Sequence, residues 1–272
     1  MIVGLDVGGT HTDVVVLRGK EILCKVKLLT DHDNLIDTVC FGIFEATRDL
    51  EPQAIQRVVV STTLATNAIV QGITDEVGIL VASGPGINPN AFAIGDYYYS
   101  VSGAVDHRGK EISPINDEEI LEIGRKLSSK NIRNLALVSK FSVRNPALEF
   151  KMRDLLADKF DNVTLGHKLS GHLNFGRRIA TAFLNASVAR ISSEFYAAVR
   201  SCMEQQSIQV PLHILKADGG TMAQESSVQY AVETILSGPA ASVMGALTVA
   251  DSAREVVVLD IGGTTTDIAV LV

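Results

Sequence analysis

The stretch from Leu5 to Asp13 reads Leu-Asp-Val-Gly-Gly-Thr-His-Thr-Asp, and the stretch from Leu259 to Asp267 reads Leu-Asp-Ile-Gly-Gly-Thr-Thr-Thr-Asp. Both lie within long apolar runs, so each predicts two strands joined by a tight turn. The copies stand near opposite ends of the chain, too far apart for a solenoid or propeller repeat. They predict one phosphate-binding hairpin that is used twice, once on each side of a cleft.

The turn of each hairpin carries groups that suit a phosphate. Glycine lets the backbone approach a ligand closely, and a concave run of backbone N–H groups binds anions. Threonine hydroxyls at the rim add donors, and an aspartate at a strand end can hold a hydrated Mg²⁺. A plain hairpin with a Gly-Gly turn would explain either copy alone, but two copies that agree at every fixed position argue against it.

The motif assigns a role to each of its polar residues and glycines. The phosphate-binding set is Gly8, Gly9, Thr10, Thr12, Gly262, Gly263, Thr264, Thr265 and Thr266. The metal ligands are Asp6 and Asp260, and the candidates that position a water or nucleophile are Asp13 and Asp267.

Composition narrows the class of protein. The chain has 272 residues, of which 46% are hydrophobic, so it can bury a sizeable core. A net charge of −7 without a basic cluster argues against nucleic acid as a partner. No apolar stretch is long enough to span a membrane, and the N-terminus predicts a first strand rather than a signal peptide. The three cysteines lie far apart without metal-ligand spacing, which favours free thiols in a reducing cytoplasm.

The order of predicted elements indicates an α/β protein with a mixed sheet. Strands at 2–6, 13–18, 21–27, 57–60 and 212–215, with helices at 34–48 and 175–205, predict a first lobe from residues 1–74 and 170–250. Residues 75–169 alternate buried strands, the first at 77–82, with helices, which predicts an inserted subdomain with a small parallel sheet of its own. Within it, residues 84–86 and 97–115 predict a loop and a hairpin. A short helix is expected between residue 220 and Leu236, and another after Gly238-Pro239.

Together with these hairpins, four further segments resemble the hydantoinase A, 5-oxoprolinase and acetone carboxylase family, within the actin, Hsp70 and sugar-kinase ATPase superfamily. The segments are Ser61–Ala68, Phe141–Glu149, Leu215–Gly220 and Ser237–Ala241. The resemblance implies a ribonuclease H-like ATPase lobe, with residues 251–272 as the first hairpin of a second lobe whose remainder is missing. The sequence is therefore interpreted as a fragment, and the alternative is that the rest of the second lobe lies on another polypeptide.

The resemblance also implies function. It indicates an enzyme that uses ATP and Mg²⁺ to open a cyclic amide of the hydantoin or 5-oxoproline type by phosphorylating its carbonyl oxygen. A small-molecule carbonyl substrate and a B-type partner subunit or domain are expected. The alternatives that remain open are an ATP-dependent ketone carboxylase subunit, a sugar kinase-like enzyme and a non-catalytic ATPase activator.

Two further segments are candidate sites. Thr62, Thr63, Thr66 and Asn67 stand where a buried strand meets a helix N-terminus, so they either cap the helix or hold an anion of the substrate. Gly219 and Gly220 either form a common Asp-Gly turn or, as the resemblance implies, lie near the nucleotide.

Overall fold

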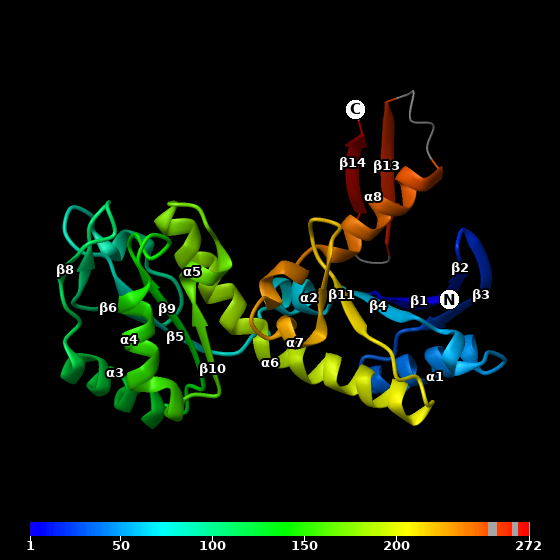
Figure 1. The fold of residues 1–272 in the computed structure, drawn as a ribbon, viewed down its shortest axis with the longest axis horizontal. Coiled ribbons are helices and arrows are strands. Elements are labelled where there is room, and N and C mark those ends of the chain that lie inside the picture. The colour runs from blue at the N-terminus through cyan, green and yellow to red at the C-terminus, as the bar shows by residue number, and fades with distance from the viewer. Residues whose placement is uncertain (250–254, 263–265, 272) are drawn as a thin grey trace. The chain divides into compact units, whose positions relative to one another are not determined.

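The computed structural model describes residues 1–249, 255–262 and 266–271, and the chain forms two compact units (Figure 1). The first unit contains Met1–Ile73 and Ile191–Val272, and the second contains Thr74–Arg190. Each unit has one large sheet, with hydrophobic core residues packed on it. The second unit is therefore an insertion into the sequence of the first.

The first unit is built on a six-stranded mixed sheet. The strands are β1 (Ile2–Val7), β2 (His11–Arg18), β3 (Glu21–Leu29), β4 (Arg57–Thr62), β11 (Leu212–Leu215) and β12 (Thr221–Ala223), in the order β12-β11-β4-β1-β2-β3. The central strand β1 pairs with β2 in antiparallel and with β4 in parallel fashion. This confirms the expected mixed sheet.

Alternation along β1 decides which face of this sheet carries the core. Val3, Leu5 and Val7 are buried, whereas Asp6 is exposed because successive side chains point to opposite faces. The buried residues pack against α1 (Leu35–Thr47) and the C-terminal half of the long helix α6 (Phe175–Gln205). The carboxylate of Asp6 therefore emerges on the face opposite this core.

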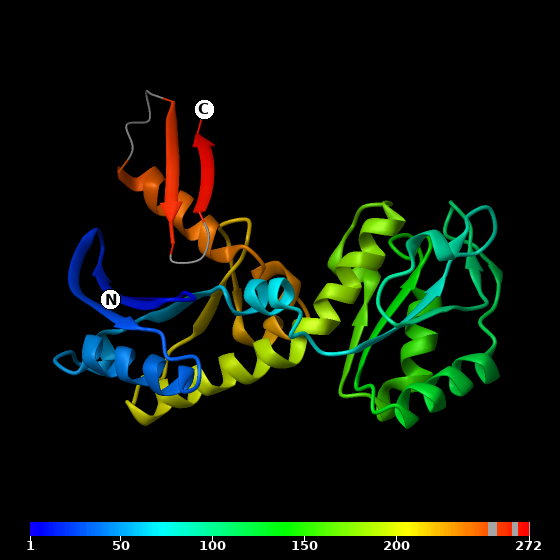
Figure 2. The same ribbon diagram turned by 180° about the vertical axis from the view of Figure 1, so that it is seen from behind.

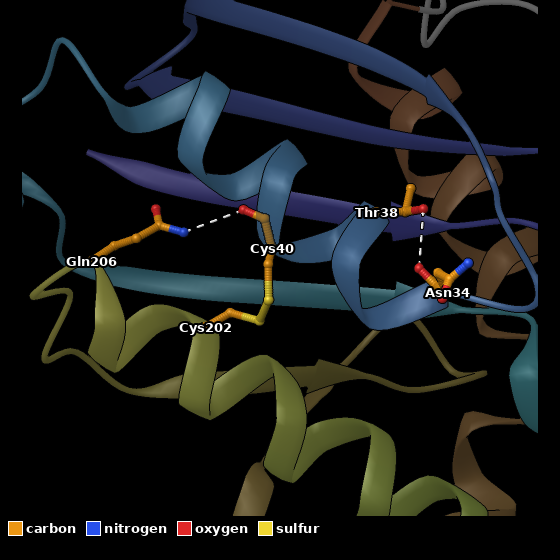
Figure 3. Close-up of a disulfide and its surroundings, with 5 residues drawn as sticks. All are labelled: Asn34, Thr38, Cys40, Cys202 and Gln206. Carbon is orange, nitrogen blue, oxygen red and sulfur yellow. Dashed lines mark hydrogen bonds between the residues drawn. A yellow bond between two sulfur atoms is a disulfide. The ribbon is translucent and has the colours of Figure 1, made fainter.

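A disulfide joins α1 to α6 in this core. Cys40 and Cys202 are bonded, with their Cα atoms 5.2 Å apart, and the Gln206 side chain donates to the Cys40 carbonyl oxygen at 3.2 Å (Figure 3). The expectation of three free thiols is thus wrong for two of them, and Cys24 is the free cysteine. The two partners lie 162 positions apart, so only the tertiary fold brings them together.

Removing this link is expected to weaken the first unit. Cys40→Ser should lower the free energy of unfolding in oxidising buffer by about 2–4 kcal/mol, since the bond closes a long loop in the unfolded chain. Denaturant titration with and without reductant measures the effect, and Cys24→Ser is the matched control. Equal stability of the parent protein with and without reductant would contradict this prediction.

The remainder of the first unit leads from the sheet to the second hairpin. It contains η1 (Pro52–Ala54), α2 (Leu64–Gln71), α7 (Gln224–Ser227), η4 (Ala231–Thr234), α8 (Ser237–Val249), β13 (Val256–Ile261) and β14 (Thr266–Leu271). The expected short helix before Leu236 is replaced by strand β12 and the two short turns of α7 and η4. The strand was missed because three residues are too few to show alternation.

The second unit has a four-stranded sheet in which all strands are parallel. Its strands are β5 (Val77–Ala82), β6 (Tyr97–Ser100), β9 (Asn134–Ser139) and β10 (Asn162–Leu165), in the order β10-β9-β5-β6. The parallel sheet was predicted, but residues 97–100 were expected in a hairpin and instead form an edge strand. The small elements around the sheet are β7 (Ala104–Val105), β8 (Glu111–Ser113), η2 (Pro89–Phe92), η3 (Ala157–Lys159) and α5 (Gly166–Leu169).

Helices cover both faces of this sheet, which is why β5 and β9 are buried throughout. The helices α3 (Asp117–Ser129) and α4 (Ala147–Leu156) pack on one face (Figure 2). The other face packs against Phe175, Ile179, Ala182 and Ala186 of α6. Because that half of α6 belongs to this core, the unit extends to Arg190, beyond the boundary expected at residue 169. No helix in the described ranges is both long and apolar enough to cross a bilayer.

Candidate functional site

The first hairpin closes through a tight turn between β1 and β2. The Gly8 N–H donates to the His11 carbonyl oxygen at 3.0 Å, and Val7 and Thr12 are paired in the ladder. A Cβ atom at Gly8 would lie only 3.0 Å from that same carbonyl oxygen. Glycine is therefore favoured at this position, because a side chain would crowd the backbone of the turn.

The tip of this turn presents unused hydrogen-bond donors. Within the described part of the chain, no hydrogen bond uses the backbone N–H groups of Gly9 or Thr10. Thr10 is exposed and Gly9 is half-exposed, so these donors are open to a ligand. Adjacent free amides at a turn are the arrangement that binds phosphate oxygens.

The end of β3 fixes the shape of the tip. The Thr30 N–H donates to the Thr10 carbonyl oxygen at 2.9 Å, and the Thr30 hydroxyl donates to the Gly8 carbonyl oxygen at 3.0 Å. The Thr12 side chain is fully buried and its hydroxyl lies 3.0 Å from that of Thr30. Thr12 therefore lies inside the hairpin and not at its rim, where the motif had placed it.

His32 is a neighbour of the tip that sequence analysis missed. Its Nε2 lies 2.7 Å from the Gly9 carbonyl oxygen, and because a carbonyl only accepts, Nε2 carries the proton of this bond. His32 stands in the connection after β3, without a motif around it. The sequence places His32 only two residues after Thr30, and nothing else in the sequence points to a contact with the hairpin.

The second hairpin repeats the ladder of the first. Asp260 is opposite Asp267 and Ile261 is opposite Thr266, as Asp6 is opposite Asp13 and Val7 is opposite Thr12. Each copy therefore places its two aspartates side by side across the strands. Gly262 and Thr266 are exposed, whereas Gly263, Thr264 and Thr265 lie outside the described residues.

The four aspartates differ in their surroundings. Asp13 forms an ion pair with the Lys27 ammonium at 2.6 Å, and Asp260 accepts a hydrogen bond from the Ser242 hydroxyl of α8. Burial by surrounding atoms raises the pKa of Asp6, although solvent reaches its carboxylate, and the charges of Asp13 and Asp260 raise it further. The Ser61 hydroxyl and Lys27 act in the opposite direction. A divalent cation would relieve the repulsion between Asp6 and Asp260.

The raised pKa of Asp6 makes a pH-dependent prediction. The protonated carboxyl binds a cation poorly, so Mg²⁺ affinity of the full-length protein should fall as pH drops through this raised pKa. The fall should begin at a higher pH than an ordinary aspartate would give. Titrating Mg²⁺ against the bound nucleotide analogue at several pH values measures it. Asp6→Asn should remove this part of the pH dependence, and an unchanged profile would contradict the assignment.

The start of α2 is held mainly by its own threonines. The Thr62 hydroxyl accepts from the Leu64 N–H at 3.1 Å, and the Thr66 hydroxyl accepts from the Leu236 N–H at 3.0 Å. The Asn67 amide donates to the Thr63 hydroxyl at 3.1 Å. Thr62 thus accepts from the first N–H of the helix, whose N-cap residue is Thr63, and Thr66 fixes the segment that enters α8.

A small cavity of about 90 Å³ brings part of this segment to the hairpin. Its lining includes Gly8 and His32 together with Thr62, Thr63 and Asn67. Of the four predicted substrate residues, three therefore lie beside the first hairpin. Thr66 does not line this cavity.

The Asp218-Gly219-Gly220 segment forms the turn between β11 and β12. The Gly219 N–H donates to the Lys216 carbonyl oxygen at 3.1 Å, and the Gly220 N–H donates to the Asp218 carboxylate at 2.9 Å. Gly219 has φ of +80°, a conformation that favours glycine. Both amides are consumed inside the turn, so the turn itself explains these glycines, and they offer no free donors to a nucleotide.

Comparisons with known proteins match almost the whole length of the chain. Residues 2–160 match the hydantoinase/oxoprolinase N-terminal region, and residues 178–272 match the hydantoinase/oxoprolinase family. Caprolactamase subunit alpha of Pseudomonas jessenii is 24% identical over 97% of the chain and 42% of its own length. The acetophenone carboxylase gamma subunit of Aromatoleum aromaticum is 23% identical over 99% of the chain and 42% of its own length. The chain thus spans less than half the length of these relatives.

Solved structures share the fold. Nucleotide-free acetone carboxylase matches with a TM-score of 0.83 and 20% identity, over 99% of this chain and 43% of the other. The ATP-dependent caprolactamase from Pseudomonas jessenii matches with a TM-score of 0.78 and 22% identity, over the same shares of the two chains. The mixed sheet with its inserted parallel unit is the ATPase-like fold of these proteins, and the chain belongs to the hydantoinase/oxoprolinase family.

Proposed function

We propose that the protein is an ATP- and Mg²⁺-dependent hydrolase that opens a cyclic amide after phosphorylation of its carbonyl oxygen. The observation that carries this proposal is the pair of hairpins with the same register, each with two aspartates across the strands and a Gly-Gly-Thr sequence between the strands. The unused amides of Gly9 and Thr10 fit a bound phosphate.

The residues present fit a magnesium nucleotide. Gly8, Gly9 and Thr10 would hold phosphate oxygens from one side, and Gly262, Gly263 and Thr264 would do so from the other. Asp6 and Asp260 would hold Mg²⁺ through water, since this ion commonly takes one or two carboxylates together with phosphates and waters. When bound, ATP supplies the phosphoryl group that activates the carbonyl carbon for attack.

One of the aspartates opposite the metal ligands would orient the attacking water. Asp13 is paired with Lys27, which holds its carboxylate in place. The Asp267 carboxylate has no hydrogen bond or ion pair with any residue of the described ranges. Asp267 is therefore the better candidate for accepting a proton from water, whereas Asp13 would balance the charge of Lys27 in the first hairpin.

The relatives support carbonyl activation and a partner. One is named as a caprolactamase, and caprolactam is a cyclic amide; another is named as a carboxylase of acetophenone, a ketone. Both are named as subunits, which supports a B-type partner subunit or domain for this protein. The second relative favours the alternative function, an ATP-dependent ketone carboxylase subunit.

Phosphate release from Mg·ATP tests the proposal. The full-length protein would be assayed with its candidate partner subunit and a panel of hydantoins, lactams, and ketones with bicarbonate. Stimulation by a lactam or hydantoin supports the hydrolase, and stimulation by a ketone only with bicarbonate supports the carboxylase. Phosphorylation of a sugar, or ATP turnover that no carbonyl compound stimulates, would refute carbonyl activation.

A further inference from the structure

Three successive carbonyl groups at the tip of the first hairpin are held by one short segment that follows β3. The Gly8 carbonyl oxygen accepts from the Thr30 hydroxyl at 3.0 Å, and the Thr10 carbonyl oxygen accepts from the Thr30 N–H at 2.9 Å. The Gly9 carbonyl oxygen between them accepts from the His32 Nε2 at 2.7 Å. Thr30 and His32 together are termed the carbonyl clamp.

A held carbonyl also fixes the direction of the N–H that follows it in the chain. The two groups belong to one planar peptide unit, and in a trans peptide they point in opposite directions. Every peptide bond of the described residues is trans. Holding the Gly8 carbonyl therefore directs the Gly9 N–H away from Thr30, and holding the Gly9 carbonyl directs the Thr10 N–H away from His32. These two N–H groups are the unused donors of the tip.

The glycines of the tip give such a clamp a purpose. Glycine has more conformational freedom than any other residue, so a free Gly-Gly segment samples many orientations of its peptide units. A peptide unit that turns over presents its carbonyl oxygen where its N–H was, and a carbonyl oxygen repels a phosphate oxygen. Donors that are oriented in advance bind an anion more tightly, because binding then has no ordering cost.

A turn at Asp31 supports the segment that carries His32. The Asp31 carboxylate accepts from the Asp33 N–H at 2.9 Å and from the Asn34 N–H at 3.2 Å, and also from the Asn34 side-chain amide at 3.1 Å. This turn lies between the end of β3 and the start of α1. The His32 side chain is exposed, so this turn and the bond to Gly9 position it rather than core packing.

We propose that Thr30 and His32 are positioning residues of the phosphate site, which orient the Gly9 and Thr10 amides before a nucleotide binds. This rests on the proposed function for the identity of the ligand, a magnesium nucleotide. It adds the residues that set the affinity for its phosphates. The clamp acts through the backbone, so neither side chain touches the nucleotide.

Nucleotide binding by His32 variants of the full-length protein tests the proposal. The dissociation constant of Mg·ADP, measured by calorimetry, should rise about threefold to tenfold in His32→Ala, as the loss of one hydrogen bond predicts. The dissociation constant of adenosine, measured by competition, should not change, because adenosine has no phosphate. His32→Gln retains an N–H donor at a similar reach and should recover most of the affinity.

His107→Ala is the matched control, since His107 is an exposed histidine of the second unit. It should bind Mg·ADP as the parent protein does. Three results would overturn the role of His32: a change of less than twofold for Mg·ADP in His32→Ala, an equal loss for adenosine, or no recovery in His32→Gln.

The Thr30 hydroxyl is tested with a second matched pair. Thr30→Val removes the donor to Gly8 but keeps the shape of the side chain, and Thr30→Ser keeps the hydroxyl. Mg·ADP should bind at least about threefold more weakly to Thr30→Val and nearly normally to Thr30→Ser. Thermal unfolding checks that Thr30→Val is folded, since the change also removes the partner of the Thr12 hydroxyl. Equal affinities of the two folded variants would overturn the role of the Thr30 hydroxyl.

These binding measurements separate the clamp from the reaction. If the clamp variants weaken Mg·ADP binding but no carbonyl compound stimulates phosphate release, the proposed function fails and the clamp stands. If a carbonyl compound stimulates phosphate release and the variants bind Mg·ADP as the parent does, the clamp fails and the proposed function stands. A full-length parent protein that binds neither Mg·ADP nor Mg·ATP would refute both.

Discussion

Asp6→Asn is expected to reduce Mg²⁺-dependent ATP turnover of the full-length protein by about a hundredfold or more, because it removes a charge directed at the metal and phosphates. The same change should make the folded protein more stable at neutral pH. Ionised Asp6 is unfavourable in the fold, where burial and the charges of Asp13 and Asp260 raise its pKa. The loss of turnover would therefore not come from unfolding.

Turnover and thermal unfolding of the same preparations measure the two effects. The difference in stability should disappear in acid, below the pKa that Asp6 has when unfolded, because the carboxyl is then protonated in both states. Asp49→Asn is the control, since it removes a carboxylate whose side chain is 90% exposed. An Asp6→Asn protein with turnover near that of the parent would show that Asp6 does not serve the nucleotide.

The largest effect on stability is expected at Glu149 in the second unit. Its side chain is fully buried and accepts from the Ser139 N–H at 2.8 Å and the His167 N–H at 3.0 Å; its other contact, to the His167 Nδ1, is 2.6 Å. Arg178 is also fully buried, and it donates to the Ser139 carbonyl oxygen at 3.0 Å. Burial lowers the pKa of Arg178, and the negative charge of Glu149 opposes that effect.

Glu149→Leu should therefore lower the free energy of unfolding by about 3–5 kcal/mol, since it leaves the Arg178 charge buried and uncompensated. It also removes the acceptor for the end of β9 and the start of α5. Denaturant titration measures the loss. Glu122→Gln, an exposed member of a surface ion pair with Lys126, should change stability little. A small effect of Glu149→Leu would contradict this prediction and would mean that solvent reaches Arg178.

The fold was predictable where apolar periodicity is local. The two hairpins, the long helix at 175–205 and the parallel strand at 77–82 have the bounds or nearly the bounds that the sequence indicates. The failures concern pairing over distance. Tyr97–Ser100 resembles a hairpin strand and becomes a parallel edge strand, and Cys40 meets Cys202 only because α1 and α6 cover the same face of the sheet.

The candidate site was predictable where a motif repeats. Asp6 faces Asp13 and Asp260 faces Asp267 because the motif has the same length in both copies. His32 was missed because its contact to Gly9 depends on where β3 ends. The role of a threonine also depends on whether its strand position is buried or exposed. The motif placed Thr12 at the rim of the hairpin, but it is buried against Thr30.

The phosphate-binding role of the first hairpin can be tested with a structure of the full-length protein with Mg²⁺ and a non-hydrolysable ATP analogue. We expect phosphate oxygens within hydrogen-bond distance of the Gly9 and Thr10 amides, with Mg²⁺ between Asp6 and Asp260. Phosphates bound elsewhere, with these amides facing only solvent, would contradict it.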